Sequence, residues 1–177
     1  MTNNIEFRAM ILRRAKQAEK ETIWEIIQYA IEQRRLDGSR QWQDGYPNPD
    51  SIQDDMDKGY AYVVEEDGTL LLYAAVIFEK EPAYEEIQGK WLSNGDYVVL
   101  HRVAASPLAK GKNVATKFFQ MMEGLAVQNK VYSIKVDTNF DNMPMLRIME
   151  KLNYTYCGEV FFRGSPRKAF EKVLPKD

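Results

Sequence analysis

The sequence predicts an α/β fold in which a mixed, mostly antiparallel β-sheet has helices on both faces. Three observations favour this class: strand-like and helix-like periodicities alternate along the chain, Asp67-Gly68 separates two apolar runs, and a strand, a short loop and a helix follow one another over 97–126. The chain has 177 residues, 45% hydrophobic content and a net charge of −2. That composition suits one core, so we expect a single domain spanning 1–177.

Capping residues set the helix boundaries that we expect in the first half of the chain. Apolar residues recur at helical spacing over 22–35, and Gly38 is a helix stop. Asn48 followed by Pro49 predicts a second helix, because asparagine caps free amides and proline fits the first helical position. This second helix should end near Gly59.

The second half of the chain contains a β-α-β unit. Pro82 and Gly89 interrupt residues 79–94, which we expect to form a connection with one helical turn. The strand at 97–104, the helix that follows it and the strand at 132–136 should form a right-handed crossover, which makes the two strands parallel. The full expected order is a strand at 6–13, a helix at 22–35, a helix from 49 to about 59, strands at 60–66, 69–78 and 97–104, a helix from 114, a strand at 132–136, a helix at 142–152, and strands at 155–162 and 168–173.

Composition argues against several classes of protein. The near-balanced charge gives no reason to expect nucleic acid as a partner. Cys157 is the single cysteine, which excludes an internal disulfide and fits a reducing compartment. Residues 1–20 lack the apolar region of a signal peptide, and no later run is long enough to cross a bilayer. We therefore expect a cytoplasmic protein with no nucleic-acid or membrane partner and no metal, and the sequence leaves a homodimer open.

The loop that follows the central strand predicts an anion site. At a helix start several backbone N–H groups lack partners and the macrodipole is positive, so a phosphate that reached residues 111–115 would meet donors. Lys110 and Lys112 add positive charge, and Gly111 permits a close approach to the backbone. The alternative is an ordinary surface loop that bears lysines. A Walker-type loop is excluded, because Asn113 stands where that loop has serine or threonine.

Several short motifs add to this pattern. They lie in the central strand, in the loop after it, at the end of the next strand, in the helix that follows and before the final hairpin. They are His101-Arg102-Val103-Ala104, the loop through Gly111 and Ala115, Val136-Asp137-Thr138-Asn139, Asn142 with Met145, Lys151-Leu152-Asn153-Tyr154, and Cys157-Gly158. Together with the order of the elements, these motifs resemble the GNAT superfamily of acyl-CoA-dependent N-acyltransferases over nearly the whole chain.

The resemblance implies that acetyl-CoA binds in a gap between the strands that end at Val103 and Asp137, which splay apart after a bulge. The family's phosphate loop reads Arg or Gln, two variable residues, Gly, one variable residue, then Gly or Ala. Leu108, Gly111 and Asn113 hold these positions here, so only the glycine matches, although asparagine tolerates a left-handed backbone. The cofactor-binding residues that the resemblance implies are Val103, Ala104, Leu108, Ala109, Lys110, Gly111, Lys112, Asn113, Val114, Ala115, Thr116, Asn142 and Met145.

His101 is the candidate general base, because it is the only histidine and an imidazole titrates near neutral pH. Because side chains alternate between the two faces of a strand, His101 is expected to lie on the same face as Tyr97 and Val103. The alternative is a packed structural histidine, and Tyr97 and Glu79 are weaker candidates that would hold a water chain. Many family members place a tyrosine acid where this sequence has Met149, so the role of side-chain proton donor is unfilled at that position.

The acceptor is expected to bind at the loop that contains Gln41, Trp42 and Tyr46, since recognition residues commonly lie in loops. The alternative is that Trp42 and Tyr46 close the core beneath this loop. Asp137 would bind the ammonium group of a substrate. A carboxylate at a strand end is also typical of turn capping, and this second interpretation stays open.

These features predict an N-acetyltransferase that moves an acetyl group directly from acetyl-CoA to a primary amine. The acceptor is a small-molecule or protein amine, and the sequence does not separate the two. We expect Tyr154 to pack in the core, so that water would protonate the leaving thiolate, which needs little acid assistance. The alternative function is a noncatalytic acyl-CoA-binding sensor or regulatory protein, which the missing tyrosine acid and the altered phosphate loop favour.

Overall fold

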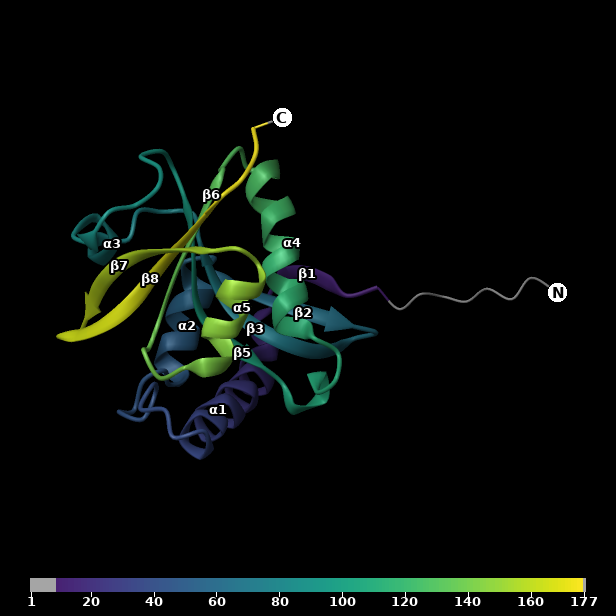
Figure 1. The fold of residues 1–177 in the computed structure, drawn as a ribbon. Helices are drawn as coiled ribbons and strands as arrows, with labels where there is room; N and C mark the ends of the chain where they lie inside the picture. The colour runs from purple at the N-terminus through teal and green to yellow at the C-terminus, as the bar shows by residue number, and fades with distance from the viewer. Residues whose placement is uncertain (1–8, 177) are drawn as a thin grey trace.

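The computed structural model describes residues 9–176, and Figure 1 shows their fold. A mixed sheet runs through the molecule and is flanked by helices. The helices are α1 (Lys20–Leu36), α2 (Pro49–Asp57), α3 (Pro82–Glu85), α4 (Val114–Gln128) and α5 (Met143–Lys151), with short 3-10 helices at Gln17–Glu19 and Pro107–Ala109. The strands are β1 (Ile11–Arg14), β2 (Ala61–Glu66), β3 (Thr69–Ile77), β4 (Gln88–Gly89), β5 (Val98–Ala105), β6 (Ser133–Thr138), β7 (Thr155–Phe162) and β8 (Ser165–Val173).

Within the described residues the strands form an eight-stranded sheet in the order β1-β2-β3-β5-β6-β8-β7-β4. Neighbouring strands are antiparallel except for β5 and β6, which run parallel. The parallel pair is joined through α4, as expected for a β-α-β unit. The predicted class, a mixed and mostly antiparallel sheet with flanking helices, is therefore confirmed.

The structure differs from the expected elements at both edges of the sheet. At one edge, β1 begins at Ile11, and the start of the strand expected at 6–13 falls outside the described residues. At the other edge, β4 lies within the connection expected at 79–94 and pairs with β7. Two residues are too few to show a strand periodicity, so the sequence pattern carried no signal for β4.

The turn between β7 and β8 is tighter than expected, and β8 starts at Ser165 rather than at 168. Arg163 and Gly164 have φ values of 49° and 73°. Two consecutive residues with positive φ form the two-residue hairpin turn that matches the twist of its strands. Phe162 therefore pairs directly with Ser165.

β4 and β7 approach each other closely where Gly89 faces Gly158. A Cβ added to Gly158 would lie 2.2 Å from the carbonyl oxygen of Gln88, and one added to Gly89 would lie 2.1 Å from that of Cys157. The two glycines also have φ values of 138° and 146°, which side chains rarely adopt. Only glycine fits this contact.

The Gly158→Ala substitution is expected to destabilise the protein by roughly 1–3 kcal/mol, because the added methyl group meets backbone atoms in a strained conformation. For a chain of this size the Tm should fall by about 2–12 °C in calorimetry. Gly95→Ala is the matched control, since a Cβ at Gly95 meets nothing within 4 Å. Equal Tm values for the two variants would contradict the close approach.

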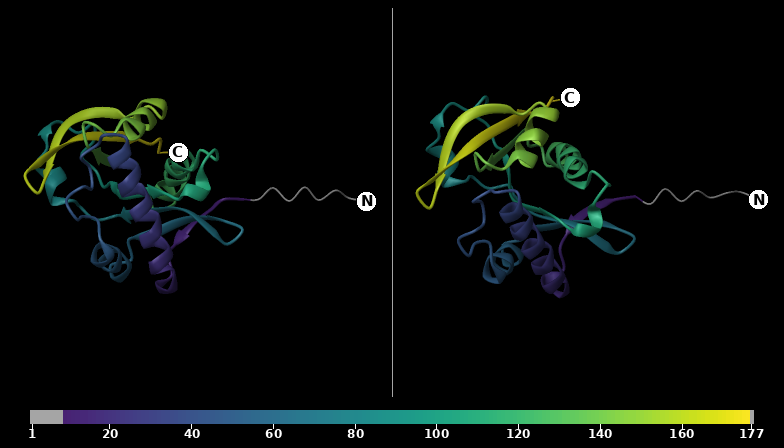
Figure 2. Two further views of the ribbon diagram at one scale, coloured as in Figure 1. Left: turned by 90° about the horizontal axis from the view of Figure 1, so that it is seen from below. Right: turned by 60° about the horizontal axis from the view of Figure 1, so that its bottom comes forward.

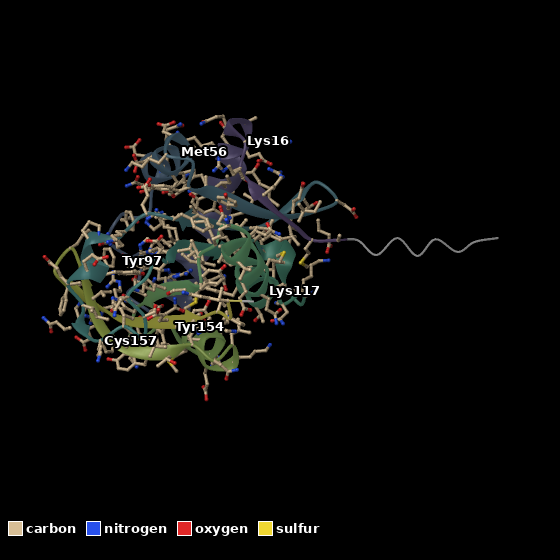
Figure 3. The ribbon with its side chains drawn as sticks, turned by 90° about the horizontal axis from the view of Figure 1, so that it is seen from above. Lys16, Met56, Tyr97, Lys117, Tyr154 and Cys157 are labelled. Atoms are coloured by element: carbon tan, nitrogen blue, oxygen red, sulfur yellow. The ribbon has the colours of Figure 1, made fainter. Side chains whose placement is uncertain are left out.

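Helices cover both faces of the sheet (Figure 2). α4 and α5 lie over the larger core cluster, which includes Phe118 and Tyr154. α1 and α2 lie over a second cluster, which includes Ile27 and against which Met56 packs. In Figure 3, Met56 and Tyr154 lie on opposite sides of the view. A third cluster around Tyr97 includes side chains from α3, β5 and β7, and it continues the face that α1 and α2 cover.

The parallel pair opens into a gap toward the carboxyl ends of its strands. The last residues that pair are Leu100 and Val136, although β5 continues to Ala105 and β6 continues to Thr138. Beyond that point β5 pairs only with β3, and β6 pairs only with β8. The splayed strands that the family resemblance implied are therefore present.

A β-bulge in β5 lies at the start of this gap. His101 pairs with Ala75, and Ala104 pairs with Tyr73, so two residues of β5 stand opposite one residue of β3. Arg102 lies in the bulge and has a φ of 53°. Positive φ is uncommon outside glycine and is often found at functional sites.

The bulge changes which side chains share a face, and the expected alternation is wrong at one position. His101 contacts Tyr84 on the α3 side of the sheet, whereas Val103 packs in the core beneath α4 on the opposite face. The extra residue shifts the alternation of side chains by one. As a result His101 and Arg102 both point to the face that α1, α2 and α3 cover, where Arg102 binds Asp55.

Candidate active site

A cavity of about 350 Å³ lies where the splayed ends of β5 and β6 meet the loop after α1. Its wall also includes residues of α2, of the segment before α3, of the start of α5 and of the β7–β8 turn. The residues in this wall that the sequence singled out are Gln41, Trp42, Tyr46, Glu79, His101, Val103, Asp137, Asn142 and Met145. The fold thus brings the candidate base, the candidate acceptor-binding residues and part of the candidate cofactor site into one cavity.

His101 stands between two carboxylates in this cavity. Its Nε2 lies 3.6 Å from Glu81 Oε2, and its Nδ1 lies 3.5 Å from Asp137 Oδ2. The contact with the imidazole lowers the pKa of Glu81, and the burial of Glu81 opposes that shift. A proton accepted by the imidazole would therefore have negative charge on both sides.

Tyr84 holds the Asp137 side chain in place. Its hydroxyl donates a hydrogen bond of 2.6 Å to Asp137 Oδ2. Burial raises the pKa of Tyr84 well above its usual value, and the charge of Asp137 raises it further, so the hydroxyl remains a donor at neutral pH. The Tyr84 ring also packs edge-on against His101, with 5.9 Å between the ring centroids. Sequence reasoning missed Tyr84, because its partner lies 53 residues away in the chain.

Tyr97 and Glu79, the weaker candidates for a proton pathway, have partners within the chain. The Glu81 backbone N–H donates to the Tyr97 hydroxyl at 3.0 Å, and that hydroxyl donates to Glu85 Oε1 at 2.9 Å. Burial is the main cause that raises the pKa of Tyr97 to about 12, so this phenol is protonated at neutral pH. Glu79 accepts a hydrogen bond of 2.6 Å from Tyr60. Tyr97 therefore contributes to the position of Glu81, beside His101.

Arg102 is the centre of a buried network that the sequence did not reveal. Its Nε and Nη2 donate to the two carboxylate oxygens of Asp55 at 2.8 and 2.6 Å, and its Nη1 donates to the Tyr46 hydroxyl at 2.5 Å. The Tyr73 hydroxyl also donates to Asp55, at 2.5 Å. The one signal in the sequence was an acidic side chain three residues after Ile52, on the buried face of α2. The network joins α2, β3 and the bulge of β5.

The loop after α1 contributes to both the core and the cavity. Trp42 is buried in the core cluster beneath α1, has a φ of 64° and also lines the cavity. Gln41 Oε1 accepts a hydrogen bond of 2.8 Å from Asn142 Nδ2. Asn142 Oδ1 accepts from the Met145 backbone N–H at 3.3 Å and so caps α5. Asn142 therefore ties the start of α5 to the loop after α1.

The loop between β5 and α4 uses some of its amides internally. The backbone N–H groups of Ala109, Lys110 and Lys112 donate to carbonyl oxygens within the loop. In the described chain, the N–H groups of Gly111 and Asn113 make no such bond. The first-turn amides of α4, at 114–116, lie at the helix start, where N–H groups have no intrahelical partner. The free donors of this loop are therefore the N–H groups of Gly111, of Asn113 and of the start of α4, whereas the N–H group of Lys112, within the expected 111–115 range, is already bonded.

The side chains of this loop differ from those that a phosphate site usually offers. Leu108 is 63% exposed and has no polar atom. Lys112 Nζ forms an ion pair of 2.7 Å with Glu66, which offsets its charge, whereas Lys110 is exposed. The side chains of Ala109, Val114 and Thr116 are buried. The loop therefore offers backbone N–H groups and the ammonium group of Lys110 to a ligand.

Three further residues are buried, as the sequence predicted for Tyr154. Met149, at the position of the family's tyrosine acid, is fully buried. Tyr154 is buried and packs edge-on against Phe119, with 6.0 Å between ring centroids. Cys157 is a buried free thiol whose pKa is raised, mainly by burial. These environments favour packing over catalysis for all three residues.

Residues 9–176 contain no group of three or more His, Cys, Asp or Glu side chains that could hold a metal ion. Over the same range, every helix is too short or too polar to cross a bilayer.

Comparison with known proteins assigns the fold to a class. A crystal structure of a GNAT-family acetyltransferase from Streptococcus agalactiae matches with a TM-score of 0.86 and 41% identity, over 98% of this chain and 100% of the other. At 18% identity, yncA from Salmonella typhimurium, solved with its cofactor acetyl-CoA, shares the fold with a TM-score of 0.63 over 96% of each chain. No curated protein matched significantly.

The family assignment follows from the sequence match. The model of the Acetyltransferase (GNAT) family matches residues 20–154, from the start of α1 to the residue before β7. This range contains the bulge, the gap between β5 and β6, and the loop before α4. The chain therefore belongs to the GNAT acetyltransferase family, as the motifs in its sequence indicated.

Proposed function

We propose that this protein is an N-acetyltransferase that moves an acetyl group from acetyl-CoA directly to a primary amine. The observation that carries the proposal is the opening of the parallel pair after Leu100 and Val136, with His101 and Asp137 in the wall of the adjoining cavity. Membership of the GNAT family supports the reaction class. The shared fold of yncA, which was solved with acetyl-CoA, supports the choice of cofactor.

The backbone around the gap fits acetyl-CoA. Val103 and Ala104 lie beyond Leu100, the last residue of β5 that pairs with β6, so their backbone groups on that side would pair with the pantetheine arm. At Gly111 a Cβ would meet nothing within 4 Å, so the loop has open space beside free amides. These amides, with the start of α4, would hold the pyrophosphate. The remaining proposed contacts come from Leu108, Ala109, Lys110, Lys112, Asn113, Val114, Ala115 and Thr116 in the loop and helix start, and from Asn142 and Met145 near the thiol end.

When bound, acetyl-CoA supplies a thioester carbonyl, and the acceptor nitrogen forms the C–N bond as the C–S bond breaks and CoA leaves as a thiolate. The acceptor must first be neutral, and freeing the lone pair of an alkyl ammonium at pH 7 costs roughly 4 kcal/mol. His101 takes this proton on its imidazole, and Glu81 and Asp137 stabilise the resulting charge. Met149 cannot donate a proton, so water protonates the thiolate, and the hydroxide that remains takes the second proton, which the nitrogen loses after the C–N bond has formed. A backbone N–H near Val103 would stabilise the oxyanion.

The cavity favours a small amine as the acceptor over a protein amine. Its volume of about 350 Å³ is at the lower end of the range for small-molecule sites. The carboxylates of Glu81 and Asp137 would attract the ammonium group toward His101. Gln41, Trp42 and Tyr46 would form the opposite wall of the acceptor site.

A panel of primary amines tests this function. Each amine is mixed with acetyl-CoA and the protein, the free thiol of CoA is titrated, and the acetylated product is identified by mass spectrometry. We expect amine-dependent CoA release with at least one class of amine. Tight CoA binding without release across the panel would contradict the enzyme and support the noncatalytic acyl-CoA binder, which the burial of Met149 in place of a tyrosine acid favours.

Gly111→Trp is expected to raise the KM for acetyl-CoA by at least about tenfold, because an indole at this position fills the space beside the free amides. Gly38→Trp is the matched control: Gly38 has a φ of 80° against 81° for Gly111, and a Cβ there also meets nothing within 4 Å. The two variants therefore carry the same backbone strain. Equal KM values for acetyl-CoA in both would exclude the loop as the pyrophosphate site.

A further inference from the structure

The charges in the cavity wall are unevenly paired. Lys58, Arg102 and Arg163 each have a carboxylate partner, which is Asp54 at 2.9 Å, Asp55 at 2.6 Å and Asp44 at 3.5 Å, respectively. Arg34, near the end of α1, also lines the cavity, and it has no carboxylate within 4.0 Å among residues 9–176. A partly buried cation without an anion is costly unless a ligand supplies the missing charge.

The surroundings of Arg34 fix its guanidinium group in one place. Its Nη1 donates to the Ala30 carbonyl oxygen at 3.2 Å, and its Nη2 donates to that of Val103 at 3.3 Å. The guanidinium carbon lies 3.7 Å from the centroid of the Trp42 ring. The Nε is buried without any hydrogen-bond partner in the described chain. Neutral carbonyls and an aromatic ring thus hold the group, and none of them neutralises it.

Arg34 remains charged at the pH of the cell. Burial lowers the pKa of Arg34 to about 10, and the charge of Asp37 opposes this shift. A group with a pKa near 10 is almost fully protonated at pH 7. The cavity therefore contains a fixed positive charge in the wall formed by α1, in addition to the acidic groups around His101.

Arg34 is close enough to His101 for one small molecule to reach both. Its Nη2 contacts the carbonyl oxygen of Val103, two residues after His101 on β5. Two residues span at most roughly 7 Å, and the bulge at Arg102 shortens this distance. An acid group bound to Arg34 and an amine beside His101 would thus fit within the length of an amino acid.

Arg167 is the other partly buried arginine in the cavity wall without a carboxylate partner within 4.0 Å in the described chain. It differs from Arg34, because its Nη1 donates to the Ser165 hydroxyl at 2.8 Å and because the charge of Asp137 acts on it. Arg34 is therefore the stronger candidate for an anion partner.

We propose that the acceptor is a zwitterion, an amine that also carries a carboxylate, and that Arg34 binds this carboxylate while the amine faces His101, Glu81 and Asp137. This inference rests on the proposed acetyltransferase function and narrows it to amino acids and similar small molecules. Trp42 acts as a positioning residue, because its ring holds the guanidinium in place.

Matched pairs of amines test the acceptor class. The pairs are γ-aminobutyrate and butylamine, L-ornithine and putrescine, and L-lysine and cadaverine, with phosphoethanolamine and ethanolamine as a phosphate arm. We expect kcat/KM to be at least tenfold higher for the carboxylate member of at least one pair. A preference for the amines that lack a carboxylate, or for phosphoethanolamine alone, would overturn the inference while leaving acetyl transfer intact. No CoA release with any amine would instead overturn the proposed function, and the acceptor class with it.

Arg34→Gln tests the role of the side chain. Loss of a charge-assisted hydrogen bond should raise the KM for the carboxylate acceptor by about ten- to a hundredfold. The KM values for acetyl-CoA and for the amine that lacks a carboxylate should not change, and Arg34→Lys should restore part of the affinity. Arg35→Gln is the matched control, because Arg35 is exposed and pairs with Glu32.

Other outcomes for these variants would contradict the inference. An equal fall in kcat for all amines would assign Arg34 to the transition state, and a raised KM for acetyl-CoA would assign it to the cofactor. If Arg34→Gln does not fold, the matched pairs on the unmodified protein and the Arg34→Lys variant still decide the question.

Discussion

His101→Ala is expected to lower kcat for acetyl transfer by about 10²–10⁴-fold at pH 7, the usual contribution of a general base. The imidazole lies between Glu81 and Asp137, and an alanine at this position leaves no group there that can accept a proton. The fold-decrease in kcat should become smaller as the pH rises toward 10, because the acceptor amine then loses its proton without a base from the protein. Initial rates of CoA release between pH 6 and 10, at saturating acceptor, measure this effect.

The pH dependence distinguishes catalysis by His101 from a structural role. If the ring only packs against Tyr84, the substitution should lower the rate by the same factor at every pH. His101→Gln keeps a polar side chain of similar size and controls for packing. CoA binding and the Tm of each variant show whether the fold is retained. A parallel pH–rate profile in His101→Ala and the unmodified protein would remove His101 as the base.

Asp55→Ala is expected to destabilise the protein by about 3–5 kcal/mol, because it leaves the buried charge of Arg102 without a partner. The Asp55 side chain is 3% exposed and that of Arg102 is 14% exposed, so little water would replace the lost carboxylate. The Tyr73 hydroxyl would lose its acceptor as well. For a chain of this size the Tm should fall by about 6–20 °C, as measured by calorimetry.

A double substitution tests the reason for this loss. Removing both charges in Asp55→Leu with Arg102→Met should recover much of the stability, since two apolar side chains of similar size leave no buried charge. Asp54→Ala is the control, because Asp54 pairs with Lys58 at the exposed surface, where an ion pair contributes little. A double variant as unstable as Asp55→Ala would show that the unpaired charge of Arg102 is not the cause of the destabilisation.

The local signals in the sequence predicted the elements of this fold well. The Asn48-Pro49 helix start, the hairpin at Asp67-Gly68 and the parallel strands on either side of α4 all follow from chemistry within a few residues. Sequence patterns failed where two distant segments set the structure. β4 exists only because Gly89 and Gly158 permit two backbones to touch.

For the same reason, the sequence predicted several residues of the candidate site but not the side chains that they contact. Gln41, Trp42, Tyr46, His101 and Asp137 do line one cavity. The partners of Asp137 and His101 were not foreseen, because Tyr84 and Glu81 form no motif with them and lie far away in the chain.

The sequence by itself determined the class of fold, the family and the place of the central loop and helix, because periodicity, capping and glycine positions act over short distances. The tertiary structure alone decided the chemistry around the cavity. The bulge at Arg102 turned two consecutive side chains to one face, and the packing of α1 and α3 placed Arg34 and Glu81 beside it. Charges separated by tens of residues interact only after the chain has folded, so no local pattern can show which of them are paired.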